Sequence, residues 1–576
     1  MHADPRLPVV LLWHMHQPDY RDALSGEYRL PWTLLHAIKD YTDMAAHLEE
    51  NPAARAVVNF TPVLIEQLRE LADSLAAHLR DGALLPDPVL AVLADDDLPE
   101  GEAARAALMG ALLRAHQVHL IDRYPRFAEL ARWARALLEA GRAGYASDAF
   151  LRDLGAWYYL AWMGETVKRG DARIARLLAY EGAFGVAERR ELLQVIAELL
   201  QGVLPRYRAL RERGQVEIAI SPYAHPILPL LLDFNAAREA QPDAPLPAAA
   251  AYPGGAQRVQ WHLQRAVRTL QECFGGDPQG CWPSEGALSE ASLDAIARHG
   301  FRWVASGGTV LHGTLHAQAR AVGDAPECQA YAHPGGAPVG QPLRCVFRHD
   351  GLSDLIGFTY SRWHGDDAVA NLVVELERVA EQASARADGE RLLLIALDGE
   401  NAWEHYPFNG YYFLRGLYAA LATHPRLRLC LMSEALAAPA GEATAMPAPL
   451  GRVRAGSWVH GTLATWIGDA DKNRGWDLLV DAKRAVDAAL DGGRFDAAQR
   501  ERILLQLAHC ESSDWFWWFG DYNPAESVRD FDELFRHQVA VLYALIGQPA
   551  PAALGQRISV GRGDPEGGGV MRRAQT

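Results

Sequence analysis

Short apolar runs alternate with longer amphipathic stretches along most of the chain. Eight runs rich in Val, Ile, Leu and aromatic side chains predict strands, at residues 8–13, 56–61, 216–221, 279–283, 301–306, 343–348, 391–397 and 427–432. Runs this apolar are typical of strands buried on both faces, and their alternation with helical stretches favours a parallel sheet or barrel. The pattern therefore predicts an α/β fold.

Helical patterns fill the space between several of these runs. One helix is sharply bounded, from Ser289 to His299, with Gly300 after its last turn. Residues 62–215 are almost wholly helical in pattern and rich in Ala, Leu and Arg, which predicts a large helical insertion between two barrel strands. Residues 236–257 combine Pro, Ala and Gly in the way that is typical of a loop.

The last part of the chain predicts a linker, a second domain and a tail. Pro and Ala dominate the segment at 436–455, which we expect to join a barrel domain at 1–435 to a helical domain at 456–548. Helical periodicity supports that second domain. Residues 549–576 end in a Gly-rich stretch with too little apolar content to pack, so we expect a disordered tail.

Composition and charge narrow the class of protein. The 576 residues are 49% hydrophobic and 22% charged, as in ordinary globular proteins. Asp and Glu outnumber Lys and Arg by 72 to 56, and the resulting formal charge of -16 would repel nucleic acid and anionic membrane surfaces. We therefore expect neither nucleic acid nor a membrane as a partner.

The sequence shows no membrane span, secretion signal or disulfide pattern, and this bears on the compartment of the protein. No run approaches the roughly 20 apolar residues of a membrane span, and the first apolar run is too short for a secretion signal. The six cysteines form no CxxC pair, so neither a zinc ribbon nor a disulfide framework is indicated. These features predict a cytoplasmic protein.

Two histidines, His14 and His16, come at the end of the first predicted strand. Alternation along a strand places both on one side, and α/β barrels hold their active sites just past the carboxyl ends of their strands. Such a pair can supply two metal ligands, or it can hydrogen bond within a pocket wall. The residues alone leave both interpretations open, because the sequence identifies no third ligand.

Two acidic segments follow predicted strands in the same way. Glu285 lies in the turn GCWPSEG, and Asp398 follows an apolar run in LDGENAWE. Two carboxyl groups on one rim of a barrel can act as nucleophile and acid/base on a glycosidic bond, if one is protonated and the other ionised. Either segment alone could equally be a solvated acidic turn. Glu400 and Glu404 compete with Asp398 for the acid/base role.

Tryptophans lie near these segments and in the last quarter of the chain. Trp282 and Trp403 lie close to the acidic residues, and Trp458, Trp466 and the run DWFWWF at 514–519 come later. Sugar rings expose apolar faces that stack on indole rings, while neighbouring polar groups bind their hydroxyls. Core packing explains such residues equally well.

Seven ordered segments together resemble glycoside hydrolase family 57, the group of α-amylases, amylopullulanases, 4-α-glucanotransferases and branching enzymes. They are WHMHQPDY (13–20), SPYAHPILPLL (221–231), GCWPSEGALS (280–289), FRHDGLSDLIGFTY (347–360), LDGENAWE (397–404), GSWVHGTLATWIGDADKN (456–473) and ESSDWFWWFGDYN (511–523). The resemblance is strongest to the α-amylase and amylopullulanase side. One departure is Ser306-Gly307-Gly308, where similar enzymes often carry an acidic turn.

The resemblance implies a fold and a set of roles. The fold would be an incomplete (β/α)7 barrel with a large helical insertion, followed by a C-terminal helical-bundle domain that closes over one side of the cleft. Glu285 falls on the family's nucleophile and Asp398 on its general acid/base. The expected substrate-binding residues are His14, His16, Gln17, His225, Trp282, Glu400, Trp403, Trp466, Asp514 and Trp515. That mechanism requires no metal and no other cofactor.

We therefore expect a retaining hydrolase acting on an α-glucan such as starch, glycogen or maltodextrin. It would cleave α-1,4 bonds, and the sequence leaves cleavage of α-1,6 bonds open. One alternative is transglycosylation, of the 4-α-glucanotransferase or branching type. Another is a metal-dependent mannosidase or deacetylase that uses His14 and His16 as ligands. A third is a protein that binds glucan without cleaving it.

Overall fold

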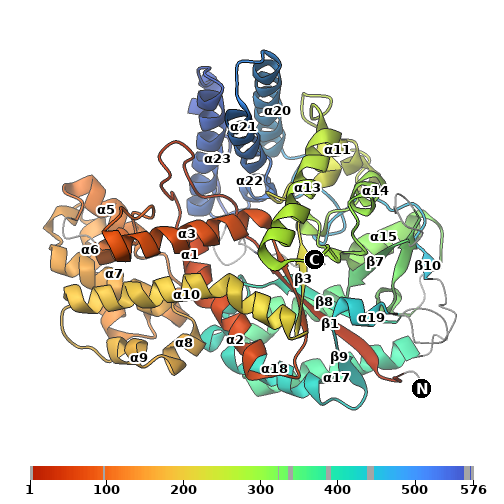
Figure 1. Cartoon of the computed structure of the whole chain (residues 1–576), viewed down its shortest axis with the longest axis horizontal. Helices are drawn as coiled ribbons and strands as arrows, with labels where there is room; N and C mark the ends of the chain where they lie inside the picture. The colour runs from red at the N-terminus through yellow and green to blue at the C-terminus, as the bar shows by residue number, and fades with distance from the viewer. Residues whose placement is uncertain are drawn as a thin grey trace.

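A closed barrel of seven parallel strands forms the centre of the molecule (Figure 1). The computed structural model describes residues 4–94, 98–321, 324–334, 342–384, 391–437, 447–563 and 571. The barrel strands are β1 (Leu7–Met15), β2 (Ala56–Phe60), β3 (Val216–Ile220), β4 (Gly280–Cys281), β5 (Trp303–Gly307), β7 (Leu343–Arg348) and β8 (Leu393–Asp398). They pair in that order, and Arg348 opposite Leu394 closes the ring. The predicted (β/α)7 barrel is confirmed.

Three short strands extend the sheet outside the barrel. β9 (Leu427–Leu429) pairs with β1, β6 (Tyr331–His333) runs antiparallel to β7, and β10 (Ala448–Pro449) pairs with β6. The apolar pattern predicts β9 but neither β6 nor β10, because two or three residues are too few to show a period. β10 lies within the expected linker, whose residues 438–446 fall outside the described part of the chain.

A helical insertion separates β2 from β3, as predicted. Between β1 and β2 the chain first forms α1 (Trp32–His36), the π-helical turn η1 (Ala37–Tyr41) and α2 (Thr42–Glu50). The insertion contains α3 (Pro62–Asp81), α4 (Ala91–Ala94), α5 (Glu102–Ala111), η2 (Gln117–Ile121), α6 (Pro125–Glu139), η3 (Ala143–Tyr145), α7 (Asp148–Trp162), α8 (Glu165–Gly170), α9 (Ala172–Leu178) and α10 (Val186–Glu212). It forms a lobe beside the barrel, on the left of Figure 1.

The remaining helices of the barrel follow its later strands. They are α11 (Leu228–Leu232), α12 (Ala236–Ala240), α13 (Gly255–Phe274), η4 (Ser284–Gly286), α14 (Glu290–Arg298), α15 (Gly308–Ala317), η5 (Pro326–Cys328), α16 (Asp350–Asp354), η6 (Leu355–Thr359), η7 (Tyr360–Arg362), α17 (Gly365–Ser384), η8 (Trp403–His405), η9 (Pro407–Gly410), α18 (Tyr411–Ala422) and α19 (Met432–Ala435). The helix predicted after Ser289 is confirmed as α14, which Ser289 caps together with Ser292. The predicted loop at 236–257 is wrong at its start, where Ala-rich sequence forms α12.

A bundle of C-terminal helices stands over one side of the barrel, at the top of Figure 1. It comprises α20 (Ala470–Asp491), α21 (Ala497–Cys510), α22 (Ser513–Trp518) and α23 (Ala525–Leu545). Residues 549–563 pack against it, in contrast to the disorder expected there: they form η10 (Ala552–Gly555) and bury Leu554 and Ile558. Apolar residues spaced through this stretch suffice for packing, and 564–570 and 572–576 lie outside the described residues. Within the described chain, no helix combines the length and apolar character needed to cross a bilayer.

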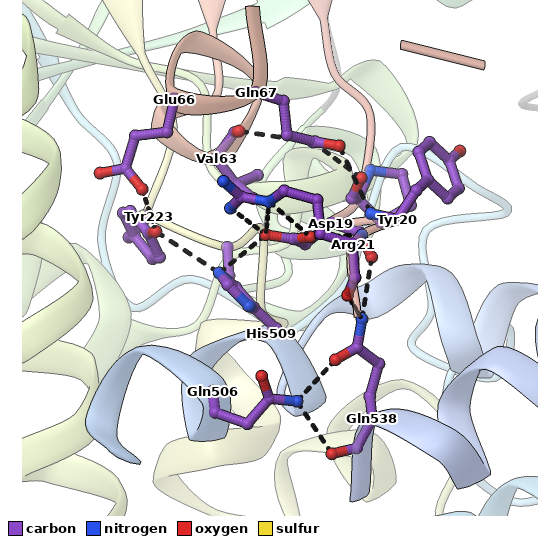
Figure 2. Close-up of polar contacts among 12 residues, drawn as sticks. Asp19, Tyr20, Arg21, Val63, Glu66, Gln67, Tyr223, Gln506, His509 and Gln538 are labelled. Atoms are coloured by element: carbon purple, nitrogen blue, oxygen red, sulfur yellow. Dashed lines mark hydrogen bonds and ion pairs between the residues drawn. The ribbon is translucent and has the colours of Figure 1, made fainter. Parts of the chain in front are cut away.

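Buried polar contacts join this bundle to the loop that follows β1 (Figure 2). Asp19 accepts from Arg21 Nε at 3.0 Å and lies 3.2 Å from Nε2 of His509 on α21. Gln538 on α23 donates to the backbone oxygens of Asp19 and Arg21 at 3.3 and 2.9 Å. The bundle therefore fixes the loop that leads away from His16.

Candidate active site

The carboxyl ends of the barrel strands open into one cavity of about 1580 Å³. Eight of the residues expected from the sequence line it: His14, His16, Gln17, His225, Glu285, Asp398, Glu400 and Asp514. They come from the ends of β1, β3, β4 and β8 and from α22, so the barrel and the C-terminal bundle build the cavity together. A cavity of this size can enclose several sugar units.

Glu285 is held in an unusual backbone conformation at the cavity wall. Its φ is 58° and its ψ is 24°, in the left-handed region that few non-glycine residues adopt, and such residues cluster at functional sites. Trp458 Nε1 donates to Glu285 Oε2 at 3.1 Å, and Ser513 Oγ donates to Oε1 at 3.3 Å. The turn thus delivers one carboxyl group, with a donor on each oxygen, into the cavity.

Asp398 ends β8 on the other side of the cavity. Its Oδ2 accepts a hydrogen bond from Asn401 Nδ2 at 3.0 Å, and its backbone lies beside that of His14 in the register of the sheet. Burial raises the pKa of Asp398 to about 6. Burial, together with the charges of Asp398 and Asp514, raises the pKa of Glu285 to about 8. The carboxyl groups of 285 and 398 therefore lie within electrostatic reach of each other.

Glu400 is a third carboxyl group in the cavity. Its Oε1 accepts from the backbone N–H of His16 at 3.1 Å and from Gln17 Nε2 at 3.4 Å, while Oε2 is buried without a hydrogen-bond partner in the described part of the chain. Burial and the charge of Asp398 raise its pKa well above the usual value. Both effects favour the protonated form of Glu400 over its carboxylate.

Three imidazole rings stack along one wall. The ring of His225 lies 3.9 Å from that of His16 and 4.9 Å from that of His14, measured between centroids. His14 and His16 share one side, as predicted. His225 reaches the stack because its backbone is left-handed, with a φ of 59°.

Each ring has its own polar partner. Asn59 turns its amide nitrogen to Nδ1 of His14, at 2.6 Å, and its oxygen to backbone N–H groups. Because Nδ1 accepts, the proton of His14 is on Nε2, which is buried and has no partner among the described residues. Burial and the neighbouring His16 lower the pKa of His14 to about 3. His14 is therefore a neutral donor at the wall of the cavity.

His16 and His225 connect the barrel to α22. His16 Nε2 donates to Asp514 Oδ2 at 2.8 Å, and hydrogen bonds from His16 and Ser512 hold the pKa of Asp514 below its usual value although burial opposes this. His225 Nδ1 lies 2.9 Å from Ser513 Oγ, which in turn donates to Glu285. Burial and the neighbouring imidazoles hold the pKa of His225 well below its usual value. A neutral His225 thus supports the Ser513 hydroxyl that binds Glu285.

Trp458 is a site residue that the sequence pattern did not single out. Besides its hydrogen bond to Glu285, its ring lies 4.8 Å from the guanidinium of the buried Arg348. A Cβ on Gly307 would lie 2.7 Å from Trp458 Cα, so the glycine at this departure from the family pattern permits the close approach. The resemblance implied Trp466 of the same segment as the substrate-binding tryptophan, whereas Trp458 is the one that lines the cavity.

Four expected substrate-binding tryptophans do not line the cavity. Trp282, Trp403, Trp466 and Trp515 are at most 1% exposed and pack in the interior. Trp403 Nε1 donates to Gly399 O and Trp515 Nε1 to His509 O, each at 2.9 Å. The hydrogen bonds of Trp403 and Trp515 stabilise the segments that carry Asp398 and Asp514. All four tryptophans pack in the core, which is the alternative that the sequence left open.

A metal ion could be held by one group within the described residues. The ligand atoms of His16, His225 and Asp514 lie within 4.8 Å of one another. This group differs from the predicted pair, because it takes His225 and Asp514 in place of His14. His16 and Asp514 bond each other directly, so an ion would have to displace that hydrogen bond.

Comparisons with known proteins show the family and the fold of the chain. The profile of the family described as glycosyl hydrolase family 57 matches residues 10–447. A branching enzyme from Thermococcus kodakaraensis aligns with a TM-score of 0.56 and 14% identity over 94% of this chain and 90% of its own. The α-amylase AmyC from Thermotoga maritima aligns with a TM-score of 0.53 and 14% identity over 94% and 93%. No curated protein sequence gives a significant match.

Proposed function

The chain belongs to glycosyl hydrolase family 57, and on that premise we propose that it is a retaining hydrolase of α-glucans such as starch, glycogen or maltodextrin. The observation that carries the proposal is the pair Glu285 and Asp398, which come from opposite strands of the barrel and share one cavity. All six cysteines are buried free thiols, and this supports a reducing compartment such as the cytoplasm.

In the proposed reaction Glu285 attacks the anomeric carbon while the bond to the departing oxygen breaks. Asp398 gives its proton to that oxygen, and a glycosyl ester forms on Glu285. Asp398 then takes a proton from water, whose oxygen attacks the same carbon and releases Glu285. Two inversions at one carbon leave the product with the configuration of the substrate.

The pair holds one proton between about pH 6 and about 8, which is the state that this reaction needs. The two pKa values place that proton on Glu285, whereas the reaction needs it on Asp398. We propose that the substrate moves it. A glycosidic oxygen beside Asp398 favours the protonated acid there, and a partly positive anomeric carbon favours the ionised form of Glu285.

Other polar groups of the cavity can bind the sugar hydroxyls. His14 offers a buried N–H and Glu400 a buried carboxyl oxygen, and Asp514 and Gln17 also line the cavity. Donors that are desolvated before substrate arrives reject ligands that cannot pair with them. This supports a polyhydroxyl substrate.

Substitution and product analysis test the proposal. Glu285→Gln should fold with an unchanged melting temperature and lose at least about 1000-fold in turnover of maltoheptaose, since it removes the nucleophile. Glu181→Gln, at an exposed position, is the matched control. Substantial activity in Glu285→Gln would remove Glu285 from this role.

Transglycosylation is the second candidate, supported by the likeness in fold to a branching enzyme. Here a sugar hydroxyl in place of water attacks the glycosyl ester. Incubation with maltoheptaose, pullulan and glycogen separates the two, because a hydrolase yields only shorter chains. Longer or newly branched products would assign a transferase.

The metal-dependent alternative now centres on His16, His225 and Asp514. It predicts that treatment with EDTA followed by dialysis abolishes turnover and that zinc restores it. Full activity after that treatment would dismiss it.

A further inference from the structure

The cavity extends beyond the two carboxyl groups to a wall built by the segments that follow β1, β2 and β8. Four histidines line this part: His36 of α1, His116 and His119 at η2, and His405 of η8. We call these residues the histidine wall. Trp32 and Glu404 line the cavity beside it.

Buried contacts hold the histidine wall in place. His36 Nδ1 lies 2.7 Å from Oδ2 of the buried Asp40, whose other oxygen pairs with Lys39 at 2.5 Å. Lys39 Nζ also donates at 3.1 Å to Oδ1 of Asn409, which lies in η9 just after η8. These bonds tie α1 and η1 to the segment that carries His405.

The helical insertion joins the same surface. The ring of His116 lies 4.6 Å from that of His119 and 5.6 Å from that of His405. His116 Nδ1 accepts from the backbone N–H of His119 at 3.1 Å, so His116 presents its Nε2 as a donor. The insertion and the segment after Asp398 therefore form one continuous wall.

The chemistry of the wall suits a neutral ligand. Burial lowers the pKa of His116 and of His119, which disfavours the charged rings that would attract phosphate or carboxylate. The neighbouring acid is Glu404, which repels anions as well. Neutral imidazoles offer donors and acceptors for hydroxyls, and the half-buried Trp32 offers an apolar ring for stacking.

The order of strands assigns this wall to one side of the reaction. In the ring of strands β8 lies between β7 and β1, whereas β4, which Glu285 follows, lies across the barrel. His405 follows β8 directly and His36 follows β1, so the histidine wall lies on the side of Asp398. In the proposed reaction the departing oxygen takes its proton from Asp398, and the departing chain must lie on that side.

We propose that the histidine wall binds the glucan units on the leaving-group side of the scissile bond. The inference rests on the proposed function and names the residues that hold the chain beyond Asp398. The same surface receives an incoming acceptor sugar, because the reverse of the first step is transfer to that sugar.

Two substrates separate this role from the chemistry at Glu285. Maltoheptaose must place sugar units on the leaving-group side, whereas α-maltotriosyl fluoride releases only fluoride. In His116→Ala, His405→Ala and Trp32→Ala, kcat/KM for maltoheptaose should fall about tenfold, the size expected for one lost hydrogen bond or stacking contact. Their kcat/KM for α-maltotriosyl fluoride should stay within about twofold of that of the unaltered enzyme.

His364→Ala is the matched control, since His364 is an exposed histidine outside the cavity lining. It should change neither value. Equal losses on both substrates would place the wall on the donor side or give it a purely structural role, and no loss on either would show that it binds no sugar. Either result overturns the inference while the proposed function stands. Failure of the unaltered enzyme to turn over both substrates would overturn the proposed function and this inference together.

Discussion

Trp458 connects the position of Glu285 to its protonation. The indole N–H donates to Oε2 and thereby stabilises the carboxylate against the burial that raises its pKa. Ser513 acts in the same sense on Oε1. Two donors on a buried carboxyl group are the arrangement that a nucleophile needs, because they oppose its protonation.

The pH dependence follows from the coupled pair. Below about pH 6 both Glu285 and Asp398 are protonated and no nucleophile remains, while above about pH 8 both are ionised and no acid remains. We expect kcat/KM for maltoheptaose to follow a bell with limbs near these two values, measured at constant ionic strength. A profile that is flat from pH 5 to pH 9 would contradict the coupling.

Trp458→Phe removes the N–H and keeps a ring in place. The indole N–H lowers the pKa of Glu285, so its removal should raise that pKa and move the alkaline limb to higher pH. We expect kcat/KM to fall about 10- to 100-fold, as for the loss of a hydrogen bond to a charged group. Trp466→Phe is the matched control, since the Trp466 N–H has no hydrogen-bond partner among the residues that the structure describes and the ring does not line the cavity. An alkaline limb that stays in place in Trp458→Phe would contradict this role.

The sequence predicted the residues of the site unevenly. Carboxyl groups and histidines after apolar strands were found, because the end of a parallel strand defines where its next side chains go. The tryptophans of the cavity were not identified in this way. Trp466 and Trp515 pack in the interior, and only the folded chain shows that Trp458 contacts Glu285. An indole ring suits a core and a sugar site equally well.

At the scale of elements, the end of β5 determines where Trp458 lies. Gly307 ends this strand, and the backbone of Trp458 passes so close that no side chain fits between them. The glycine at 307 therefore leaves room for the backbone of Trp458 at the end of β5.

Gly307→Ala tests this contact. The added methyl should displace Trp458, lower kcat/KM at least about tenfold and cost about 1–3 kcal/mol of stability, measured by urea unfolding. Gly110→Ala is the matched control, because Gly110 lies in α5 with no atom near its added methyl group. That variant should keep full activity and gain about 0.5–1 kcal/mol. Normal activity in Gly307→Ala would show that the close approach does not matter.

Long elements were predicted better than short ones. Each of the eight predicted runs contains a strand, because a continuous apolar run of this length is buried on both faces wherever it occurs. β6 and β10 were not predicted, because β6 pairs with β7 and β10 pairs with β6 only once the barrel has folded. α12 was predicted as part of a loop, because the Pro and Gly residues that follow it are typical of loops.

At the scale of the molecule, the C-terminal bundle completes the cavity and is held to the barrel by buried charge. Glu511 at the end of α21 accepts from Arg258 Nη2 at 2.7 Å and lies 2.8 Å from His262 Nε2, both on α13. It also accepts from Tyr252 at 2.5 Å. These contacts place α22, with Ser513 and Asp514, over the site.

Glu511→Gln should destabilise the whole chain by about 3–5 kcal/mol, since it leaves Arg258 buried without its partner. Its charged neighbours lower the pKa of Glu511 to about 2, below the value in the unfolded chain, although burial opposes this. The contribution is therefore present above the unfolded pKa and is lost as pH falls toward 2. Asp481→Asn, which breaks an exposed ion pair with Arg484, should change stability by less than about 1 kcal/mol. Equal changes in the free energy of unfolding for the two variants, measured by urea unfolding, would contradict a stabilising role for the buried contacts of Glu511 between the bundle and the barrel.

The most direct measurement identifies the atom that bonds to the sugar. A 5-fluoro-α-glycosyl fluoride of a maltooligosaccharide should form a long-lived ester with a retaining enzyme, and peptide mapping by mass spectrometry then finds the modified residue. We expect one ester, on the peptide that contains Glu285, and none in Glu285→Gln. An ester on Asp398, or no ester on any peptide of an enzyme that turns over the substrate, would contradict it.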